Sequence, residues 1–189
     1  LTDGILKALN VQPIKEQHVD TNNSEAYEYF LRAKYKLQTR NNSEDIDIIR
    51  NLLNKSINLD DNLVLSKWLL GVTYKIIGEY NKAMSIYENA LFQSEKKDDK
   101  RNTIRLLTSL ANINLNLGDS KQSLDYYNRA ISIAKEIGWK SEIEHLKASI
   151  ALYYWSSGNY DKAIELMEES HNYNLWLGDN DVMDLYNNF

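Results

Sequence analysis

Five of the seven glycines in this 189-residue chain recur at an interval of 40 residues. One series consists of Gly78, Gly118 and Gly158, and a second consists of Gly138 and Gly178. Self-similarity at a fixed period is the mark of a repeat architecture. Other positions obey the same shift, with large residues mapping onto large ones and small residues onto small ones. The matching sets are Leu70, Leu110 and Ile150; Gly71, Ala111 and Ala151; Ala83, Ser123 and Ala163; Tyr87, Tyr127 and Met167; and Ala90, Ala130 and Ser170.

Each repeat predicts a helical hairpin. Apolar and small residues recur at helical spacing on both sides of a glycine, which indicates two amphipathic helices joined by a tight turn. The glycine supplies the left-handed backbone that ends the first helix, and Asp119 and Asn159 are suited to cap the second. Ser141 with Glu144 predicts a capping box at the start of another helix.

The small residues of the pattern have a packing role. Where the two helices of a hairpin cross closely, Gly71, Ala83 and Ala90 leave room for Tyr74 and Tyr87 to pack over them. The run Leu70-Gly71-x-x-Tyr74, followed by Ala83-x-x-x-Tyr87 and Ala90, resembles the signature of the tetratricopeptide repeat family. The resemblance covers at least residues 62–178.

This resemblance implies an all-α fold, an α-solenoid of antiparallel hairpins in a right-handed superhelix, with about four repeats and a terminal capping helix. The 40-residue period is similar to that of long-repeat members of the family. The proline that often closes such repeats is absent, and Asn114 and Ser123 depart from the expected residue types. The expected divisions are a linker or short helix at 1–23 and a repeat domain at 24–189, with repeats at 24–61, 62–99, 100–139 and 140–178 and a capping helix or truncated repeat at 179–189.

Composition narrows the classes of partner. The 27 acidic residues exceed the 22 basic ones, and no basic stripe is dense enough to bind nucleic acid. No apolar stretch is long enough to span a membrane. The chain has no cysteine, which excludes thiolate metal sites and fits a cytoplasmic location. The segment from Glu25 to Tyr35 is similar to the start of helical repeat regions in bacterial cyclases and transcription regulators. With Leu1 as the first residue, we therefore expect a piece of a larger bacterial signalling protein.

Catalytic and metal chemistry is not predicted. His18, His145 and His171 lie far apart in the repeat frame, and no phosphate-binding glycine loop occurs. We therefore predict no enzymatic activity, no cofactor and no metal. An enzyme would need a pocket with paired carboxylates of shifted pKa, whereas the adjacent carboxylates here favour solvated positions. These adjacent pairs are Asp60 with Asp61, Asp98 with Asp99 and Glu168 with Glu169.

A protein or peptide partner is the main functional prediction. In stacked hairpins the first helix of each repeat lines the concave side. Asn112 and Asn116 are suited to hold the main chain of an extended peptide, and Lys75 and Arg105 to bind carboxylates. The predicted groove residues are Tyr27, Phe30, Lys34, Trp68, Val72, Lys75, Arg105, Asn112, Asn116, His145, Leu152 and Trp155.

Two alternatives stay open at this point. Trp68 and Trp155 fit either a binding surface or burial against a neighbouring helix. Trp68 also stands where chaperone-binding members of the family carry a lysine, so an internal peptide or helix is favoured over a chaperone tail. Self-association is the second functional hypothesis, with a homodimer formed through Val182, Met183, Leu185, Tyr186 and Phe189.

Overall fold

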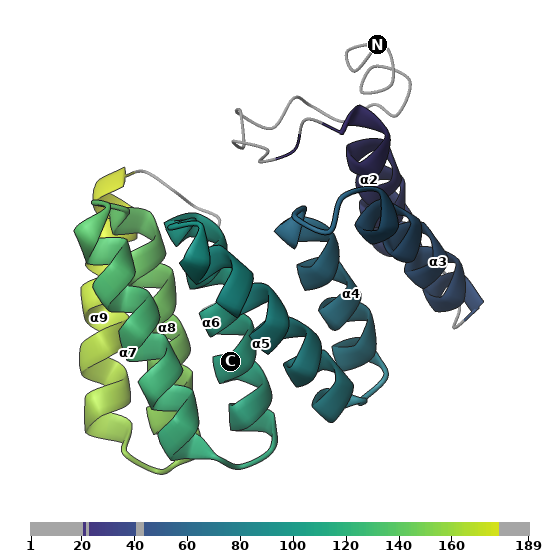
Figure 1. Ribbon diagram of the computed structural model, residues 1–189. Helices are drawn as coiled ribbons and strands as arrows, with labels where there is room; N and C mark the ends of the chain where they lie inside the picture. Colours follow the sequence, from purple (N-terminus) through teal and green to yellow (C-terminus); the bar gives the residue numbers. More distant parts are fainter. Residues whose placement is uncertain (1–20, 22, 41–43, 178–189) are drawn as a thin grey trace. The chain divides into compact units, whose positions relative to one another are not determined.

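The computed structural model describes residue 21, residues 23–40 and residues 44–177 (Figure 1). These residues form eight α-helices and no strand, which confirms the all-α fold and the α-solenoid class. The chain divides into two compact units, Leu1–Ser66 and Lys67–Phe189, and each is described here by itself. The helices are α2 (Ser24–Gln38), α3 (Glu44–Leu59), α4 (Val64–Ile76), α5 (Tyr80–Lys96), α6 (Lys100–Asn116), α7 (Ser120–Glu136), α8 (Lys140–Ser156) and α9 (Tyr160–Leu177).

The first unit is built on the hairpin of α2 and α3, which pack against each other. The side chain of Asn23 caps α2 by accepting a hydrogen bond from the Ala26 amide at 3.1 Å. The buried Ser56 hydroxyl on α3 donates to the Ala26 carbonyl oxygen at 2.7 Å. A small residue at each of these positions lets the two helices come close enough for this contact.

The second unit contains successive antiparallel hairpins. Helix α5 packs on α6, α6 on α7, α7 on α8 and α8 on α9 (Figure 1). The predicted packing of aromatic over small residues holds between α4 and α5, because a Cβ atom added to Gly71 would lie 2.2 Å from Cε1 of Tyr87. Tyr87 and Ala83 are both fully buried. Only glycine allows the tyrosine ring to lie against the backbone at this distance.

The turns follow the predicted glycine pattern. Gly78 has a φ of 78°, and the amide of Glu79 donates to the Tyr74 carbonyl oxygen at 3.0 Å, which closes the end of α4. One turn uses a different residue, since Asp98 takes the left-handed conformation with a φ of 55° at the position 40 residues before Gly138. The same hydrogen-bond pattern ends the helix there, so the turn geometry is set by the repeat and not by glycine alone.

The helix caps confirm part of the prediction. Asp119 accepts a hydrogen bond from the Gln122 amide at 3.1 Å, and Asn159 accepts one from the Lys162 amide at 3.3 Å. The predicted capping box of Ser141 with Glu144 is wrong. Helix α8 already begins at Lys140, so Ser141 lies inside the first turn and does not occupy the cap position.

In the third repeat, the unexpected residue Asn114 is stabilised by a hydrogen bond. Asn114 is 4% exposed, and its Nδ2 donates to the Leu110 carbonyl oxygen at 2.9 Å. A buried amide therefore binds its own helix where the repeat pattern expects an aromatic ring.

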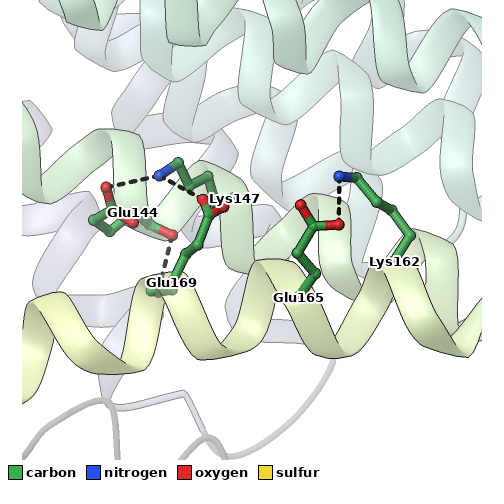
Figure 2. Close-up of polar contacts among 6 residues, drawn as sticks. Glu144, Lys147, Lys162, Glu165 and Glu169 are labelled. Atoms are coloured by element: carbon green, nitrogen blue, oxygen red, sulfur yellow. Dashed lines mark hydrogen bonds and ion pairs between the residues drawn. The ribbon is translucent and has the colours of Figure 1, made fainter.

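Polar contacts also tie the last hairpin together (Figure 2). Lys147 on α8 forms ion pairs with Glu144 at 3.2 Å and with Glu169 on α9 at 3.0 Å. Partial burial lowers the pKa of Lys147, but its hydrogen bonds to Glu169 and Glu144 outweigh burial and raise the pKa overall. Lys67, 80 residues earlier, makes a related contact by donating to Gln93 on α5 at 3.0 Å. Lysines at one repeat position thus link first and second helices.

Several predictions fall outside the described residues. The predicted N-terminal linker lies almost entirely there, as does the capping segment at 179–189. The five residues predicted to mediate self-association, Val182, Met183, Leu185, Tyr186 and Phe189, belong to that segment.

Candidate partner-binding face

A row of polar side chains runs along α6. Arg105, Ser109, Asn112 and Asn116 stand at helix positions i, i+4, i+7 and i+11, which places them on one side of the helix. We call these four residues the α6 stripe. The equivalent residues 40 positions away are all apolar in α4 and mixed in α8. They are Leu65, Leu69, Val72 and Ile76 in α4, and His145, Ser149, Leu152 and Ser156 in α8.

Arg105 is held in place from its own helix. Asp99 caps α6 by accepting from the Asn102 amide at 3.1 Å, and its second oxygen accepts from Nδ2 of Asn102 at 2.5 Å. The oxygen of the same Asn102 side chain accepts a hydrogen bond from Nη1 of Arg105. A helix cap, an amide and a guanidinium are therefore linked in series, and the amide orientation is fixed by the carboxylate.

Trp68 on α4 lies beneath this guanidinium. The Arg105 guanidinium carbon is 5.3 Å from the centre of the Trp68 ring, and the indole nitrogen donates to the Ser109 hydroxyl oxygen at 3.0 Å. Ser109 in turn donates to the Arg105 carbonyl oxygen at 2.9 Å. Trp68 is half-buried and packs against Arg105 and Ser109 of the next repeat, so its burial against a neighbouring helix is partial, and its role in binding a partner stays a prediction.

Asn112 is held by the second helix of its hairpin. The Tyr127 hydroxyl on α7 donates to Oδ1 of Asn112 at 2.5 Å. Tyr127 is fully buried, and burial raises its pKa to about 12 against the opposing effect of the nearby Ser149 hydroxyl. The phenol therefore stays protonated and able to donate at physiological pH.

The preceding repeat shows what this contact requires. Tyr87 matches Tyr127, but Val72 stands where Asn112 does and offers no acceptor. The Tyr87 hydroxyl is buried without a hydrogen-bond partner among the described residues, and burial raises its pKa against the opposing effect of Ser109. The pairing of tyrosine with asparagine is thus specific to the hairpin of α6 and α7.

Charged residues of α8 influence Arg105. Glu142 has a pKa raised by burial, with His145 and Arg105 acting in the opposite direction. Nδ1 of His145 is 4.0 Å from the Glu142 carboxylate. Burial lowers the pKa of Arg105, while Asp99 and Glu142 raise it. These two carboxylates act on Arg105 only at longer range, because Arg105 makes no ion pair with the residues that the structure describes.

Other predicted groove residues are distributed along the helices. Val72, Lys75 and Leu152 are half-buried and Asn116 is exposed. Trp155 is 49% exposed, with its ring 5.0 Å from that of Tyr160, so burial in the core is wrong for this tryptophan.

The three residues predicted in the first repeat belong to the first unit. Tyr27 and Lys34 are half-buried. Phe30 is 3% exposed and its ring stacks on that of Tyr27 at 5.7 Å. The prediction of Phe30 as a surface residue is therefore corrected, since its apolar ring is taken up in packing.

The sequence prediction missed four residues that build this face: Asn102, Ser109, Tyr127 and Glu142. A detectable pattern existed for two of them, because Asn102 follows the cap residue Asp99 by three positions and Ser109 follows Arg105 by four. Tyr127 was recognised only as a packing residue, and its second role depends on a partner in another helix.

The acidic pairs considered for catalysis have structural partners. Asp98 forms an ion pair with Lys100 at 3.2 Å, and Asp99 caps α6. Asp60 accepts hydrogen bonds from the Asn62 amide at 2.9 Å and from the Thr21 hydroxyl. No helix within the described ranges has the length and apolar character needed to cross a membrane.

Comparison with known families decides the identity of the repeats. Two models described as tetratricopeptide repeat match residues 63–136 and residues 145–170. The chain belongs to the tetratricopeptide repeat family. Such repeats generally serve as non-catalytic scaffolds that bind other proteins, and the residues of the α6 stripe lie within the first match.

Solved structures show the same fold for this tetratricopeptide repeat protein. Aspartyl phosphate phosphatase F from Bacillus subtilis has a TM-score of 0.72 at 16% identity, over 94% of this chain and 46% of that chain. BtubC (BKLC) from P. vanneervenii has a TM-score of 0.66 at 18% identity, over 76% of this chain and 60% of that chain. MamA has a TM-score of 0.59 at 18% identity, over 90% of this chain and 82% of that chain.

The chain spans less than two thirds of the length of the first two of these proteins. Identities at this level show likeness of fold alone. A comparison with curated proteins finds no match.

Proposed function

We propose that this repeat protein is a scaffold or sensor module that binds an extended segment of a partner protein along its first helices. The proposed surface lies in the second unit and consists of the outward sides of α4 from Lys67 onward, α6 and α8; we call it the first-helix face. The observation that carries the proposal is the α6 stripe. Four polar residues occupy one side of α6 where the equivalent residues of α4 are apolar. Ser109 and Oδ1 of Asn112 are used by Trp68 and Tyr127, and the groups that remain for a partner are on Arg105, the Asn112 amide nitrogen and the exposed Asn116.

The chemistry of this face suits an extended chain. Extended peptides present unpaired backbone groups, and asparagine side chains can hydrogen-bond them. Asn112 and Asn116 are four residues apart on α6. Arg105 and Trp68 supply the residue types that dominate binding energy at protein interfaces.

Site-specific crosslinking tests this function. A photo-reactive amino acid replaces the exposed Asn116 on the first-helix face, and in a matched control it replaces the exposed Asn128 on α7. We expect crosslinking in cells of the source organism to capture a partner from position 116, with capture lost when Trp68→Ala and Asn112→Ala are added. Equal capture from positions 116 and 128, or capture insensitive to the two alanines, would argue against the proposed face.

Homo-oligomerisation is the second candidate function. On the last hairpin Trp155, Tyr160 and Ile164 are 49%, 54% and 47% exposed, and this apolar surface suits contact with a second copy of the chain. The residues predicted to mediate self-association from the sequence lie outside the described residues. Light scattering measures the mass in solution. A dimer that becomes a monomer in an Ile164→Glu variant supports this function, and a monomeric wild-type chain at about 100 μM excludes it at cellular concentrations.

The proposal also includes the cellular location of the chain and the kind of protein it belongs to. We infer that the chain works in the cytoplasm within a larger bacterial signalling protein, without a cofactor and without catalysis of its own. Support comes from the family, whose members generally bind proteins. Detection with an antibody against the repeat unit in fractions of the cell tests the location. The mass of the protein that the antibody detects shows whether the chain belongs to a larger protein.

A further inference from the structure

Two turns that are 40 residues apart in the sequence meet at one end of the second unit (Figure 1). One joins α5 to α6 and the other joins α7 to α8. Nζ of Lys100 in the first turn is 2.8 Å from Oε1 of Glu136 in the second. The Arg101 guanidinium carbon is 5.0 Å from the centre of the Trp139 ring. We call the two segments, residues 96–101 and 135–140, the turn edge.

Positive charge is concentrated on the turn edge. The edge holds six basic and three acidic residues, although the whole chain has a net charge of -5. The basic residues are Lys96, Lys97, Lys100, Arg101, Lys135 and Lys140, and the acidic ones are Asp98, Asp99 and Glu136. Neither segment alone is a long basic run, so this density arises only when the fold brings the two turns together.

The acidic residues of the edge are already engaged. Asp98 and Glu136 both pair with Lys100, at 3.2 Å and 2.8 Å, and Asp99 caps α6. The other basic side chains are exposed and form no ion pair within the part of the chain that the structure describes; they are Lys96, Lys97, Arg101, Lys135 and Lys140. These five cations are therefore available to anionic groups outside the protein.

Two apolar side chains lie among these cations. Ile137 is 37% exposed and stands between Lys135 and Lys140 in the sequence. Trp139 is half-buried and occupies the cap position of α8, where Asp99 caps α6. An indole cannot accept the hydrogen bond that caps a helix, and no side-chain cap is formed at α8. The edge thus has an aromatic ring where the repeat elsewhere has a carboxylate.

This combination suits the surface of a membrane. Anionic phospholipids attract clusters of basic side chains, tryptophan rings favour the level of the headgroups, and a small apolar side chain can enter between them. Nucleic acid offers phosphates but no apolar layer for Ile137. An acidic peptide is better held by a groove than by the protruding ends of two turns. Contact with a membrane surface needs no spanning segment, so it is compatible with a chain whose described helices cannot cross a bilayer.

We propose that the turn edge binds a membrane surface rich in anionic phospholipids, with its basic side chains at the phosphates and with Ile137 and Trp139 between the headgroups. This inference goes beyond the proposed function and does not depend on it. The α6 stripe runs along its helix, whereas the turn edge lies at the helix ends. The first-helix face therefore stays open, and a partner bound there would be held next to the membrane.

Sedimentation with lipid vesicles tests the inference on the full 189-residue chain. One set of vesicles contains phosphatidylcholine alone, and the other contains phosphatidylcholine with phosphatidylglycerol in a three-to-one ratio. We expect at least about tenfold tighter binding to the anionic vesicles, because only these attract the basic side chains. Raising the salt concentration from about 50 to about 200 mM should weaken that binding, since it shortens the range of the attraction.

Paired lysine variants locate the binding surface. Lys97→Gln combined with Lys140→Gln removes one cation from each turn and should weaken binding to the anionic vesicles at least about tenfold, because each basic residue near such a surface contributes about fivefold. Lys55→Gln combined with Lys121→Gln is the matched control. It removes the same charge from exposed positions outside the turn edge and should keep most of the binding. Circular dichroism verifies that both variants fold.

A polarity-sensitive dye reports the orientation of the bound chain. Because the chain has no cysteine, Ile137→Cys provides a single site for the dye. The control is Leu117→Cys, at a residue that is 50% exposed in the turn between α6 and α7, at the other end of these helices. We expect a blue shift on binding to anionic vesicles from position 137 and none from position 117.

Several results would overturn the inference: equal binding to both kinds of vesicle, equal losses in the two paired variants, or equal dye responses at the two positions. Double-stranded DNA and polyglutamate are measured at the same salt concentration. Tighter binding of either polymer than of the anionic vesicles, lost in Lys97→Gln with Lys140→Gln, would assign the edge to that polymer instead of lipid. The proposed function fails separately, because crosslinking from position 116 reports the first-helix face and does not involve these lysines.

Discussion

Gly71→Ala tests the packing that sets the spacing of α4 and α5. The added Cβ atom would lie 2.2 Å from Cε1 and 2.7 Å from Cδ1 of Tyr87, a ring that is fully buried and has no free space to enter. Forcing a methyl group into such a site costs about 1–3 kcal/mol, with this overlap toward the upper end. Alanine gains about 1 kcal/mol over glycine in a helix interior. We therefore expect a net loss of about 1–2 kcal/mol in the free energy of unfolding, measured by urea denaturation with circular dichroism.

A double-mutant cycle isolates the contact. The last hairpin combines Ala151 with Met167 at the equivalent positions, so Tyr87→Met should relieve the overlap and give a coupling energy of at least about 1 kcal/mol with Gly71→Ala. Ala111→Gly is the matched control, because position 111 already holds a fully buried methyl group and its loss should destabilise by about 1 kcal/mol. If Gly71→Ala stabilised the protein by the full helix-propensity gain, the close approach of Tyr87 would be refuted.

Three further predictions concern stability. Leu110→Ala should cost about 2–5 kcal/mol in chemical denaturation because Leu110 is fully buried, and a loss under about 0.5 kcal/mol would contradict its core position. Asp98→Gly should raise the free energy of unfolding by about 0.5 kcal/mol: relief of the left-handed conformation, about 1–2 kcal/mol, exceeds the added entropy of the unfolded chain. Tyr127 has a raised pKa in the folded state, so the stability that its protonated phenol contributes is fully present below pH 10 and is lost as the pH rises to about 12. Over that interval the free energy of unfolding of the wild type should fall by about 2–3 kcal/mol more than that of Tyr127→Phe. If the free energies of the two proteins fell in parallel with pH, the prediction would be wrong.

The hairpin packing could be predicted because the repeat constrains it several times over. Gly71, Ala83 and Tyr87 recur in type at intervals of 40 residues, and each recurrence is an independent sign that the position packs. The turn glycines gave the helix ends in the same way. Asp98 was harder to assign, because its left-handed conformation follows from its place in the period and not from its residue type.

The arrangement of the binding face was predictable only in part. Helical spacing places Arg105 and Asn112 on one side of α6, but it carries no information on which atoms of these side chains are already engaged. The contacts that decide this, with Trp68 and Tyr127, join helices distant in sequence. Capping was also ambiguous, since Ser141 and Glu144 fit a capping box while the helix begins one residue before Ser141.

Along α6, the positions that pack in the core differ from the positions proposed to bind a partner in how they vary between repeats. Leu70, Leu110 and Ile150 keep their type through three repeats, as a buried position requires. The position held by Val72 and Asn112 changes from apolar to polar, although the helices around it keep their arrangement. A solenoid gains its stability from contacts between neighbouring repeats, so a position outside those contacts is free to vary without loss of the fold. Asn114 also breaks the period, but it is buried and bonded to its own helix, so a change of residue type points to recognition only where the side chain reaches the surface, as at the exposed Asn116 on α6, which belongs to the proposed face.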